Sequence, residues 1–193
     1  MSTVTPQRLV TVDEFLTLPE DGVDRDLIRG VVVEHGRTGM TRRSREHALA
    51  EARISFFLQQ WVHSRRKPSG TVYAGEVGCI LSHDPPNVVG IDVAWISAEH
   101  VTRLNESTTR MIDGAPALAV EILSPSDKQE DVGNKIDDYL ANGVQLVWIV
   151  DPHFRTVVVH RPGQKPELFN EDQHLAGSDV LPGLDLAVSA IFA

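Results

Sequence analysis

Cysteine and long apolar runs are scarce in this chain of 193 residues, and each shortage excludes a class of protein. The single cysteine, Cys79, excludes an internal disulfide and any metal site built from several cysteines. It lies in an apolar, strand-like run, so we expect an inert core thiol. No apolar run approaches the roughly 18 residues of a membrane-spanning helix. The first residues lack the apolar core of a signal peptide, so we expect a cytoplasmic protein.

Positive charge is also scarce, because 18 Lys and Arg stand against 27 Asp and Glu, for a net charge of −9. This balance argues against a general polyanion-binding protein, since proteins hold phosphates mainly with Lys and Arg. The charge is unevenly distributed, however, and residues 37–67 form a basic segment. That segment is either a solvated helix face or a surface for an anionic partner. Its basic residues are Arg37, Arg42, Arg43, Arg45, Arg53, Arg65, Arg66 and Lys67.

The remaining composition is that of an ordinary globular protein, with 41% hydrophobic and 23% charged residues. The length is typical of one domain with a sizeable core. No internal repeat or long linker divides the chain, so we expect a single domain over residues 1–193.

The first third of the chain predicts a short helix, a β-hairpin and one long helix. Thr11 and Glu14 have the spacing of a capping box, and residues 26–28 and 31–33 flank a turn that contains glycine. Residues 44–62 are the clearest helix, because their apolar side chains recur at helical spacing. We expect these side chains to face the core: Ala48, Ala52, Ile54, Phe57, Leu58, Trp61 and Val62.

The rest of the chain alternates strands and helices. Two nearly unbroken apolar segments, residues 117–123 and 144–150, flank a predicted helix at 128–142 and would form a right-handed β-α-β crossover. The polar residues 97–114 predict a loop with a helical turn. The fold class is therefore α/β, with a mixed sheet flanked by helices. Further strands are expected at residues 71–73, 77–81, 88–96 and 156–160, and a last helix at 186–192.

Two acids interrupt apolar strands and are the main candidates for chemistry. Asp92 lies in the strand at 88–96 and Glu121 in the strand at 117–123. A buried carboxylate is costly unless it is paired or bound to a metal. Two of them on neighbouring strands suggest a shared cation, and oxygen ligands favour Mg²⁺ or Mn²⁺. The carbonyl of Ile122 is a further candidate ligand.

A lysine beside such a metal would offset the negative charge that develops on a phosphodiester under attack by water. Lys135 is the candidate, because the helix after the Glu121 strand packs back on the sheet. Simpler alternatives remain open at this point. Asp92 could be exposed at a strand end, and Lys135 could pair on the helix surface with Asp131 or Asp138.

One series of residues is more specific than any single acid. It comprises Glu121-Ile-Leu-Ser-Pro-Ser126, then Asp131, Lys135 and Tyr139, and then Gly143, Trp148 and Asp151. This pattern resembles the Uma-type family of restriction-endonuclease-like proteins, within the PD-(D/E)xK nuclease superfamily. The resemblance extends over nearly the whole chain, from Thr11 to Gly183.

The resemblance implies a restriction-endonuclease-like fold with a central mixed sheet and a Mg²⁺-dependent site. Asp92 matches the motif's aspartate and Glu121 its second acid. Leu123 stands where the motif usually has lysine, and in this family the lysine appears on the next helix, which Lys135 matches. Asp26 matches a glutamate of the first hairpin and is one methylene shorter.

The start of the long helix adds accessory candidates. His47 matches a family histidine, and it is either a phosphate contact or a surface residue. Glu46 beside it is either a surface residue or a further acid of the metal site. We expect the nearby arginines to contact DNA phosphates: Arg42, Arg43, Arg45 and Arg53.

These observations support three hypotheses. The first is a Mg²⁺- or Mn²⁺-dependent DNA endonuclease with Asp92, Glu121 and Lys135 as catalytic residues. Its DNA binding would be weak and salt-sensitive, and it would act as a homodimer because cutting both strands requires two sites. The second is a nuclease-fold binding or scaffold module without turnover, which the net charge of −9 favours. The third is a hydrolase of a small phosphorylated molecule.

Overall fold

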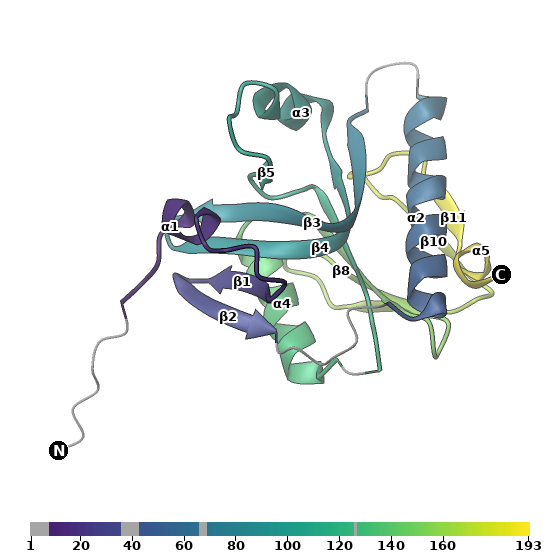
Figure 1. The fold of residues 1–193 in the computed structure, drawn as a ribbon. Coiled ribbons are helices and arrows are strands. Elements are labelled where there is room, and N and C mark those ends of the chain that lie inside the picture. Colours follow the sequence, from purple (N-terminus) through teal and green to yellow (C-terminus); the bar gives the residue numbers. More distant parts are fainter. Residues whose placement is uncertain (1–7, 36–42, 66–68, 126) are drawn as a thin grey trace.

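The computed structural model describes residues 8–35, 43–65, 69–125 and 127–193 (Figure 1). These residues form five helices and eleven strands. The helices are α1 (Val12–Leu16), α2 (Arg45–Ser64), α3 (Ala98–Leu104), α4 (Gln129–Ala141) and α5 (Val188–Phe192). The strands are β1 (Asp24–Ile28), β2 (Val31–His35), β3 (Thr71–His83), β4 (Pro86–Ile96), β5 (Ile112–Asp113), β6 (Leu118–Ile122), β7 (Leu146–Asp151), β8 (Thr156–His160), β9 (Glu167–Phe169), β10 (His174–Ala176) and β11 (Asp185–Ala187).

Nine of the described strands make one mixed sheet. Its main path runs β2-β1-β4-β6-β7-β8-β9, with β3 paired to β4 and β5 paired to β3. Strands β6 and β7 are parallel and flank α4, so the predicted β-α-β connection is confirmed. Strand β4 is the centre of the sheet, because it pairs with β3 along one edge and with both β1 and β6 along the other.

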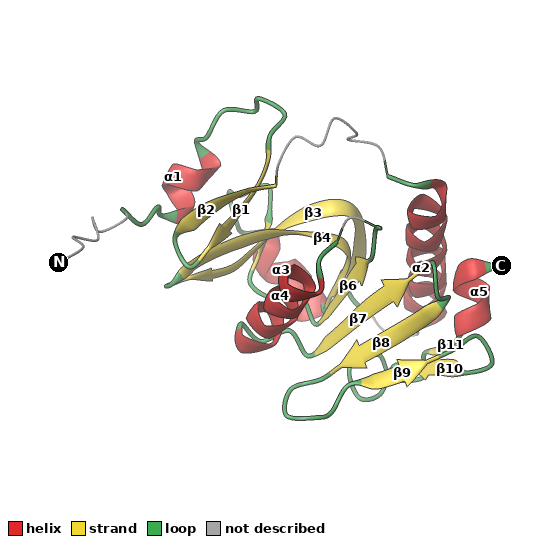
Figure 2. Cartoon of the chain, turned by 90° about the horizontal axis from the view of Figure 1, so that it is seen from below, coloured by secondary structure: helices red, strands yellow, loops and turns green. Residues whose placement is uncertain are grey.

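Helices cover both faces of the sheet, with α2 and α5 on one face and α4 on the other (Figures 1 and 2). Residues of β6 alternate between these two faces. Leu118 and Val120 pack into the core beside α2, whereas Ala119 packs into the core beside α4. Side chains therefore leave β6 alternately toward the two helices. Glu121 is placed by this period toward α4, on the same face as Ala119.

The long helix forms as predicted, but two of its expected core residues are exposed. Ser44 caps α2 by accepting a hydrogen bond from the backbone N–H of His47. The buried face is centred on His47, Ala50, Ile54, Leu58 and Trp61. The prediction that Ala48 and Ala52 face the core is wrong, because at 3.6 residues per turn they fall outside this narrow stripe.

Two segments are more regular than the sequence indicates. The predicted strands at 71–73 and 77–81 are parts of the single strand β3, joined across a β-bulge. The segment 97–114, predicted to be mainly loop, contains the two-turn helix α3, capped by Ser97, and the short strand β5. The N-terminal predictions are confirmed, since Thr11 and Glu14 form a capping box and β1 and β2 form a hairpin.

Candidate active site

The site lies where the sheet divides. Strand β4 pairs with β1 only at Val88 and with β6 only from Val93 onward. Within the described residues, positions 89–92 of β4 therefore have no strand partner on this edge. The carboxylate of Asp26 on β1 reaches into the gap and accepts a hydrogen bond of 3.2 Å from the backbone N–H of Gly90. The division exposes main-chain and side-chain polar groups that a continuous ladder would cover.

On the other edge of β4, the neighbouring strand β3 has a β-bulge directly opposite Asp92. Residues Gly75 and Glu76 on β3 both lie opposite the single residue Asp92. Both have positive φ angles, of 94° and 52°, which costs little for glycine and more for glutamate. The bulge bends β3 at this point and interrupts its ladder beside Asp92, and a second register shift follows between Ile80 and Ser82.

Asp92 is buried, with a side chain 6% exposed, so the alternative of an exposed strand end is wrong. Its Oδ2 accepts a hydrogen bond of 2.8 Å from the backbone N–H of Ile122 and lies 3.3 Å from Nε2 of His47. Its Oδ1 lies 3.5 Å from Nη2 of Arg43. Burial alone would raise the pKa of Asp92, but the contacts with His47, Ile122 and Arg43 hold that pKa below its ordinary value.

His47 joins the helix α2 to this aspartate. Its side chain is 1% exposed, and neither ring nitrogen meets hydrogen-bond geometry within the described structure. The nitrogen nearest to a partner is Nε2, beside Asp92, while Nδ1 lies 3.9 Å from Oε2 of Glu51. The alternative of a surface histidine is therefore wrong. His47 is a buried neighbour of Asp92 and does not line the cavity itself.

Glu121 stands across from Asp92 on the adjacent antiparallel strand, one position beyond the last ladder pair, Val93 with Val120. Side chains at such opposed positions share a face of the sheet. The phenol of Tyr139 donates a hydrogen bond of 2.6 Å to Oε1 of Glu121, and Nζ of Lys135 donates one of 3.3 Å to Oε2. Burial raises the pKa of Glu121; the ammonium of Lys135 opposes the rise, and the charge of Asp92 adds to it.

Lys135 reaches the sheet from α4, as the sequence predicts. Its ion pair is with Glu121, and the acid one turn later, Asp138, pairs instead with Arg29 of the hairpin turn at 2.7 Å. Burial lowers the pKa of Lys135, but the charges of Glu121, Asp26 and Asp92 outweigh it and the net pKa is raised. The lysine therefore remains an ammonium beside the carboxylates at neutral pH.

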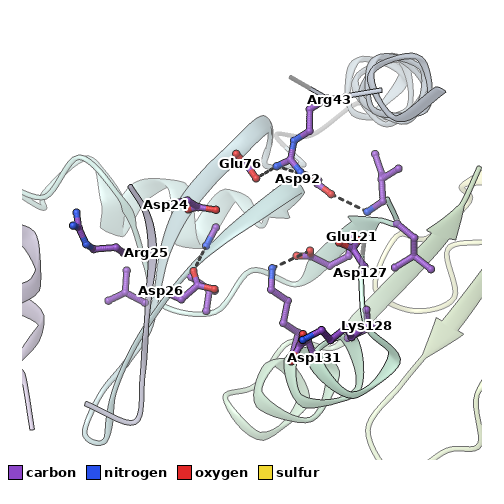
Figure 3. A pocket seen from close by; sticks show the side chains of 18 of the residues that line it. Asp24, Arg25, Asp26, Arg43, Glu76, Asp92, Glu121, Asp127, Lys128 and Asp131 are labelled. Atoms are coloured by element: carbon purple, nitrogen blue, oxygen red, sulfur yellow. Dashed lines mark hydrogen bonds and ion pairs between the residues drawn. The ribbon is translucent and has the colours of Figure 1, made fainter. Parts of the chain in front are cut away.

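These side chains surround a cavity of about 650 Å³ (Figure 3). In Figure 3, Arg43 and Glu76 meet next to Asp92, while Lys128 and Asp131 lie on the opposite wall, by α4. The charged lining residues come from β1, the bulge, β4, β6, α4 and the segments that precede α2 and α4, so the cavity is assembled from parts far apart in the sequence. They are Asp24, Arg25, Asp26, Arg43, Glu76, Asp92, Glu121, Asp127, Lys128, Asp131 and Lys135.

The donor set fits a hard divalent cation in part. The buried carboxylate of Asp92 and the partly buried one of Glu121 share one face, and a cation held by both would relieve the repulsion between them. Within the described residues, however, no three acid or histidine side chains converge closely enough to form a metal cluster. Arg43 and Lys135 supply the positive charge instead. A cation in this site would compete with both.

The other predicted residues lie in different places. Ile122 contributes its backbone N–H, to Asp92, and lines the cavity. Glu46 is half exposed and pairs with Arg45 at 2.5 Å, and neither lines the cavity. Arg53 is half buried, with Nη1 lacking a hydrogen-bond partner in the described structure. Arg42 lies outside the described residues.

Three contacts of the site were not found from the sequence. These are the hydrogen bond from Tyr139 to Glu121, the ion pair of Arg43 with Glu76, and the approach of Arg43 to Asp92. A signal existed for Glu76, since a glycine within an otherwise β-rich run, as at Gly75, indicates a bulge. No local pattern marks Arg43, because its partners are more than 30 residues away.

Fold and site together define a mixed α/β protein with paired acids and a lysine at a divided central sheet. Comparison with known families identifies the family of the chain. Residues 12–189 match the Uma2 family, which is described as "Putative restriction endonuclease". The chain belongs to this family, and the resemblance in the sequence is confirmed. No curated protein matches the chain.

A solved structure supports the assignment of the fold. The chain is similar to the crystal structure of "a putative nuclease belonging to DUF820" from Anabaena variabilis, with a TM-score of 0.77 and 24% sequence identity. The match covers 95% of this chain and 97% of that one. The restriction-endonuclease-like α/β fold is thus confirmed. Within the described residues, no helix is both long and apolar enough to cross a membrane.

Proposed function

We propose that this protein is a DNA endonuclease that hydrolyses phosphodiester bonds with Mg²⁺ or Mn²⁺. The observation that carries the proposal is the placement of Asp92 and Glu121 on facing positions of β4 and β6, with Lys135 3.3 Å from Glu121. Family membership supports the same function. An acid pair at a gap in the sheet has access to a substrate, whereas an acid pair inside a continuous sheet would not.

Asp92 and Glu121 would hold the cation, with the carbonyl of Ile122 as a further ligand and Asp26 as an accessory acid. A divalent ion there supplies Lewis acidity toward the phosphodiester and lowers the pKa of a bound water. The chain's own groups prepare the site. The N–H of Ile122 and the ring of His47 orient Asp92, and Tyr139 orients Glu121. Lys135 stabilises negative charge on the phosphate oxygens during attack by water.

The basic side chains near the start of α2 would hold the DNA backbone. Arg43 lines the cavity and Arg45 is almost fully exposed, with a side chain 94% accessible. We propose Arg42 and Arg53 as further phosphate contacts, on a protein whose net charge is −9. Because few cations are involved, we propose weak, salt-sensitive binding.

Nicking of supercoiled plasmid in the presence of Mg²⁺ or Mn²⁺ tests the proposal. The wild-type protein should nick, and Asp92→Asn and Glu121→Gln should reduce the rate by about 100-fold or more, since each removes a charge that the cation requires. Lys135→Met should reduce it by a similar factor. The matched control is Asp185→Asn, an exposed acid of β11 remote from the cavity.

Thermal melts of each variant separate lost catalysis from lost folding. If Asp92→Asn nicks as fast as wild type, or if chelation of divalent ions leaves nicking unchanged, the assignment is wrong. Cleavage of bis(p-nitrophenyl) phosphate without cleavage of plasmid would favour a hydrolase of small phosphorylated molecules.

A second candidate, a nuclease-fold binding module without turnover, is favoured by one observation. The two carboxylates already have cationic neighbours in the chain itself, Arg43 and Lys135. Calorimetric titration with Mn²⁺ distinguishes the candidates. If the protein is an endonuclease, the wild type should bind Mn²⁺ and Glu121→Gln should not. If it is a binding module, neither should bind Mn²⁺ at millimolar concentration, and both should bind DNA with the same affinity.

A further inference from the structure

One guanidinium bridges two carboxylates at the candidate active site. Nη2 of Arg43 contacts Oε1 of Glu76, in the bulge of β3, and lies 3.5 Å from Oδ1 of Asp92. Figure 3 shows the three side chains together, beside the cavity that they line. Because one nitrogen reaches both acids, the two carboxylates share a single positive charge. Arg43 therefore supplies, from within the chain, a charge that a divalent cation would otherwise bring to Asp92.

The two cations nearest the acid pair are held differently. Lys135 belongs to the regular helix α4, and its ammonium pairs with Glu121. Arg43 precedes Ser44, the N-cap of α2, so it lies outside the hydrogen-bonded turns of that helix. Its side chain is 40% exposed. Arg43 can therefore turn toward solvent without disrupting a helix or a strand.

The two acids differ in what they lose when Arg43 turns away. The side chain of Glu76 is 52% exposed, so water can solvate it. Asp92 is only 6% exposed, and its Oδ2 keeps the N–H of Ile122 and the nearby ring of His47. Its Oδ1 has Arg43 alone among the described residues. Removing the cation from a buried carboxylate is costly, so Arg43 should leave Asp92 only when another cation replaces it.

We propose that Arg43 is exchanged for a divalent cation at Asp92 and then binds the DNA backbone. This inference rests on the proposed function, because it assumes both the cation and the nucleic acid. In the metal-free protein, Arg43 neutralises Asp92 and Glu76 and is withheld from phosphates. Once released, its forked N–H groups suit a phosphate. Cation binding and DNA binding are then coupled, and each strengthens the other by the same factor.

Calorimetric titration with Mn²⁺ in the absence of DNA tests the exchange. Arg43→Gln removes the competing charge and should bind Mn²⁺ about 5-fold or more tightly than the wild type. The matched control is Lys128→Gln, which removes an exposed charge from the opposite wall of the same cavity. It should change the affinity by less than about 2-fold, because solvent and salt screen an exposed charge. Thermal melts confirm that each variant is folded.

The outcomes separate this inference from the proposed function. If the wild type binds Mn²⁺ and Arg43→Gln binds it no more tightly, the exchange is wrong and the metal-dependent nuclease stands. The exchange is also wrong if Lys128→Gln gains as much affinity as Arg43→Gln, since the effect is then general electrostatics. If neither the wild type nor Arg43→Gln binds Mn²⁺, the cation site fails, and both proposals fail with it.

Fluorescence anisotropy of labelled duplex DNA tests the release of Arg43. The measurement uses the Lys135→Met background, which keeps both acids and limits cutting. Mn²⁺ should tighten DNA binding by about 5-fold or more, and adding Arg43→Gln should abolish most of this gain. The matched control is Arg45→Gln, which should weaken binding equally with and without Mn²⁺. The release is overturned if Arg43→Gln leaves the Mn²⁺ gain unchanged, or if it weakens metal-free binding as much as Arg45→Gln does.

Discussion

At the scale of single residues, each of the two main acids of the site is held by two or more neighbours. Glu121 receives Tyr139 and Lys135 from α4, and Asp92 receives the N–H of Ile122 from β6, with His47 of α2 alongside. Both oxygens of Glu121 are therefore fixed in position before any substrate arrives. Fixed carboxylates bind a cation with less loss of side-chain entropy than mobile ones.

The first prediction concerns the phenol of Tyr139. Tyr139→Phe keeps the buried ring but removes the donor to Oε1 of Glu121, so we expect plasmid nicking to fall by about 10-fold and the Mn²⁺ requirement to rise. Nicking rates over a Mn²⁺ series measure both effects. The control is the chain's only other tyrosine, and Tyr73→Phe should be neutral. Equal nicking by both variants would show that Tyr139 does not position Glu121.

The second prediction concerns the single thiol. Burial, with the negative charge of Glu121, raises the pKa of Cys79 to about 12. Only roughly one thiol in 10,000 is ionised at pH 8, so we expect almost no reaction of the native protein with a thiol reagent at that pH. In concentrated urea one thiol per chain should react promptly. Rapid reaction of the native protein would mean that β3 is open to solvent.

At the scale of secondary structure, the bulge in β3 is the feature that shapes the site. Gly75 and Glu76 occupy the space of one residue opposite Asp92, and Glu76 there pairs with Arg43. A bulge costs ladder hydrogen bonds, so we expect its position beside the candidate aspartate to serve the site. The gap between β1 and β6 likewise interrupts the hydrogen-bond ladder beside Asp92, on the other edge of β4.

The third prediction tests this bulge. Gly75 has φ of 94° and ample space for an added methyl group, so Gly75→Ala should cost about 1–2 kcal/mol of unfolding free energy through backbone strain alone. Gly143→Ala is the matched control, because φ is 100° and its surroundings are open. Urea melts should show similar losses for both. Only Gly75→Ala should also lower nicking, and equal nicking by both would exclude a role for the bulge.

The fourth prediction concerns the two faces of α2. Ile54 is fully buried and Phe56, two residues later, is 60% exposed. Ile54→Ala should lower the free energy of unfolding by about 2–5 kcal/mol, because it leaves a cavity between α2 and the sheet. Phe56→Ala should change it by less than about 0.5 kcal/mol. Urea unfolding measures both, and equal losses would mean that Phe56 is covered in solution by another surface.

At the scale of the whole molecule, charge decides how a nucleic acid could approach. The net charge is −9, and the cavity itself contains more acids than bases. The arginines near the start of α2 are therefore the surface through which DNA binding is proposed. The homodimer expected for cleavage of both strands stays a prediction.

The fifth prediction follows from this limited set of cations. If four arginines, Arg42, Arg43, Arg45 and Arg53, contact phosphates, the logarithm of the binding constant should fall with the logarithm of salt concentration with a slope of about −3 to −4. Fluorescence anisotropy of labelled duplex DNA measures the slope. Arg45→Gln should reduce its magnitude by about 1, and Arg161→Gln, just after the far strand β8, should not. A salt-independent affinity would contradict the proposed surface.

Local sequence was sufficient to locate most of the elements and most of the acids. The apolar patterns identified α2, α4 and the strands β1–β4 and β6–β8, because an amphipathic helix and a buried strand must each repeat their apolar residues at their own period. The short strands β5, β9, β10 and β11 were not predicted, and β11 occupies residues 186–187, which were predicted to begin the last helix. Asp92, Glu121 and Lys135 were visible for a related reason. A charge inside an apolar strand, or on the helix that covers it, is too costly to be accidental.

How these groups meet depends on the packing of the whole chain. The sheet divides at β4, where strands from distant parts of the sequence meet. Tyr139 contacts Glu121, 18 positions away, and Arg43 approaches Asp92, 49 positions away. Two further features were invisible in the sequence: the exposure of Ala48 and Ala52, and a second cavity, beside Trp61 and Trp95. Register, helix rotation and cavities arise when completed elements pack against one another, and no local pattern encodes that packing.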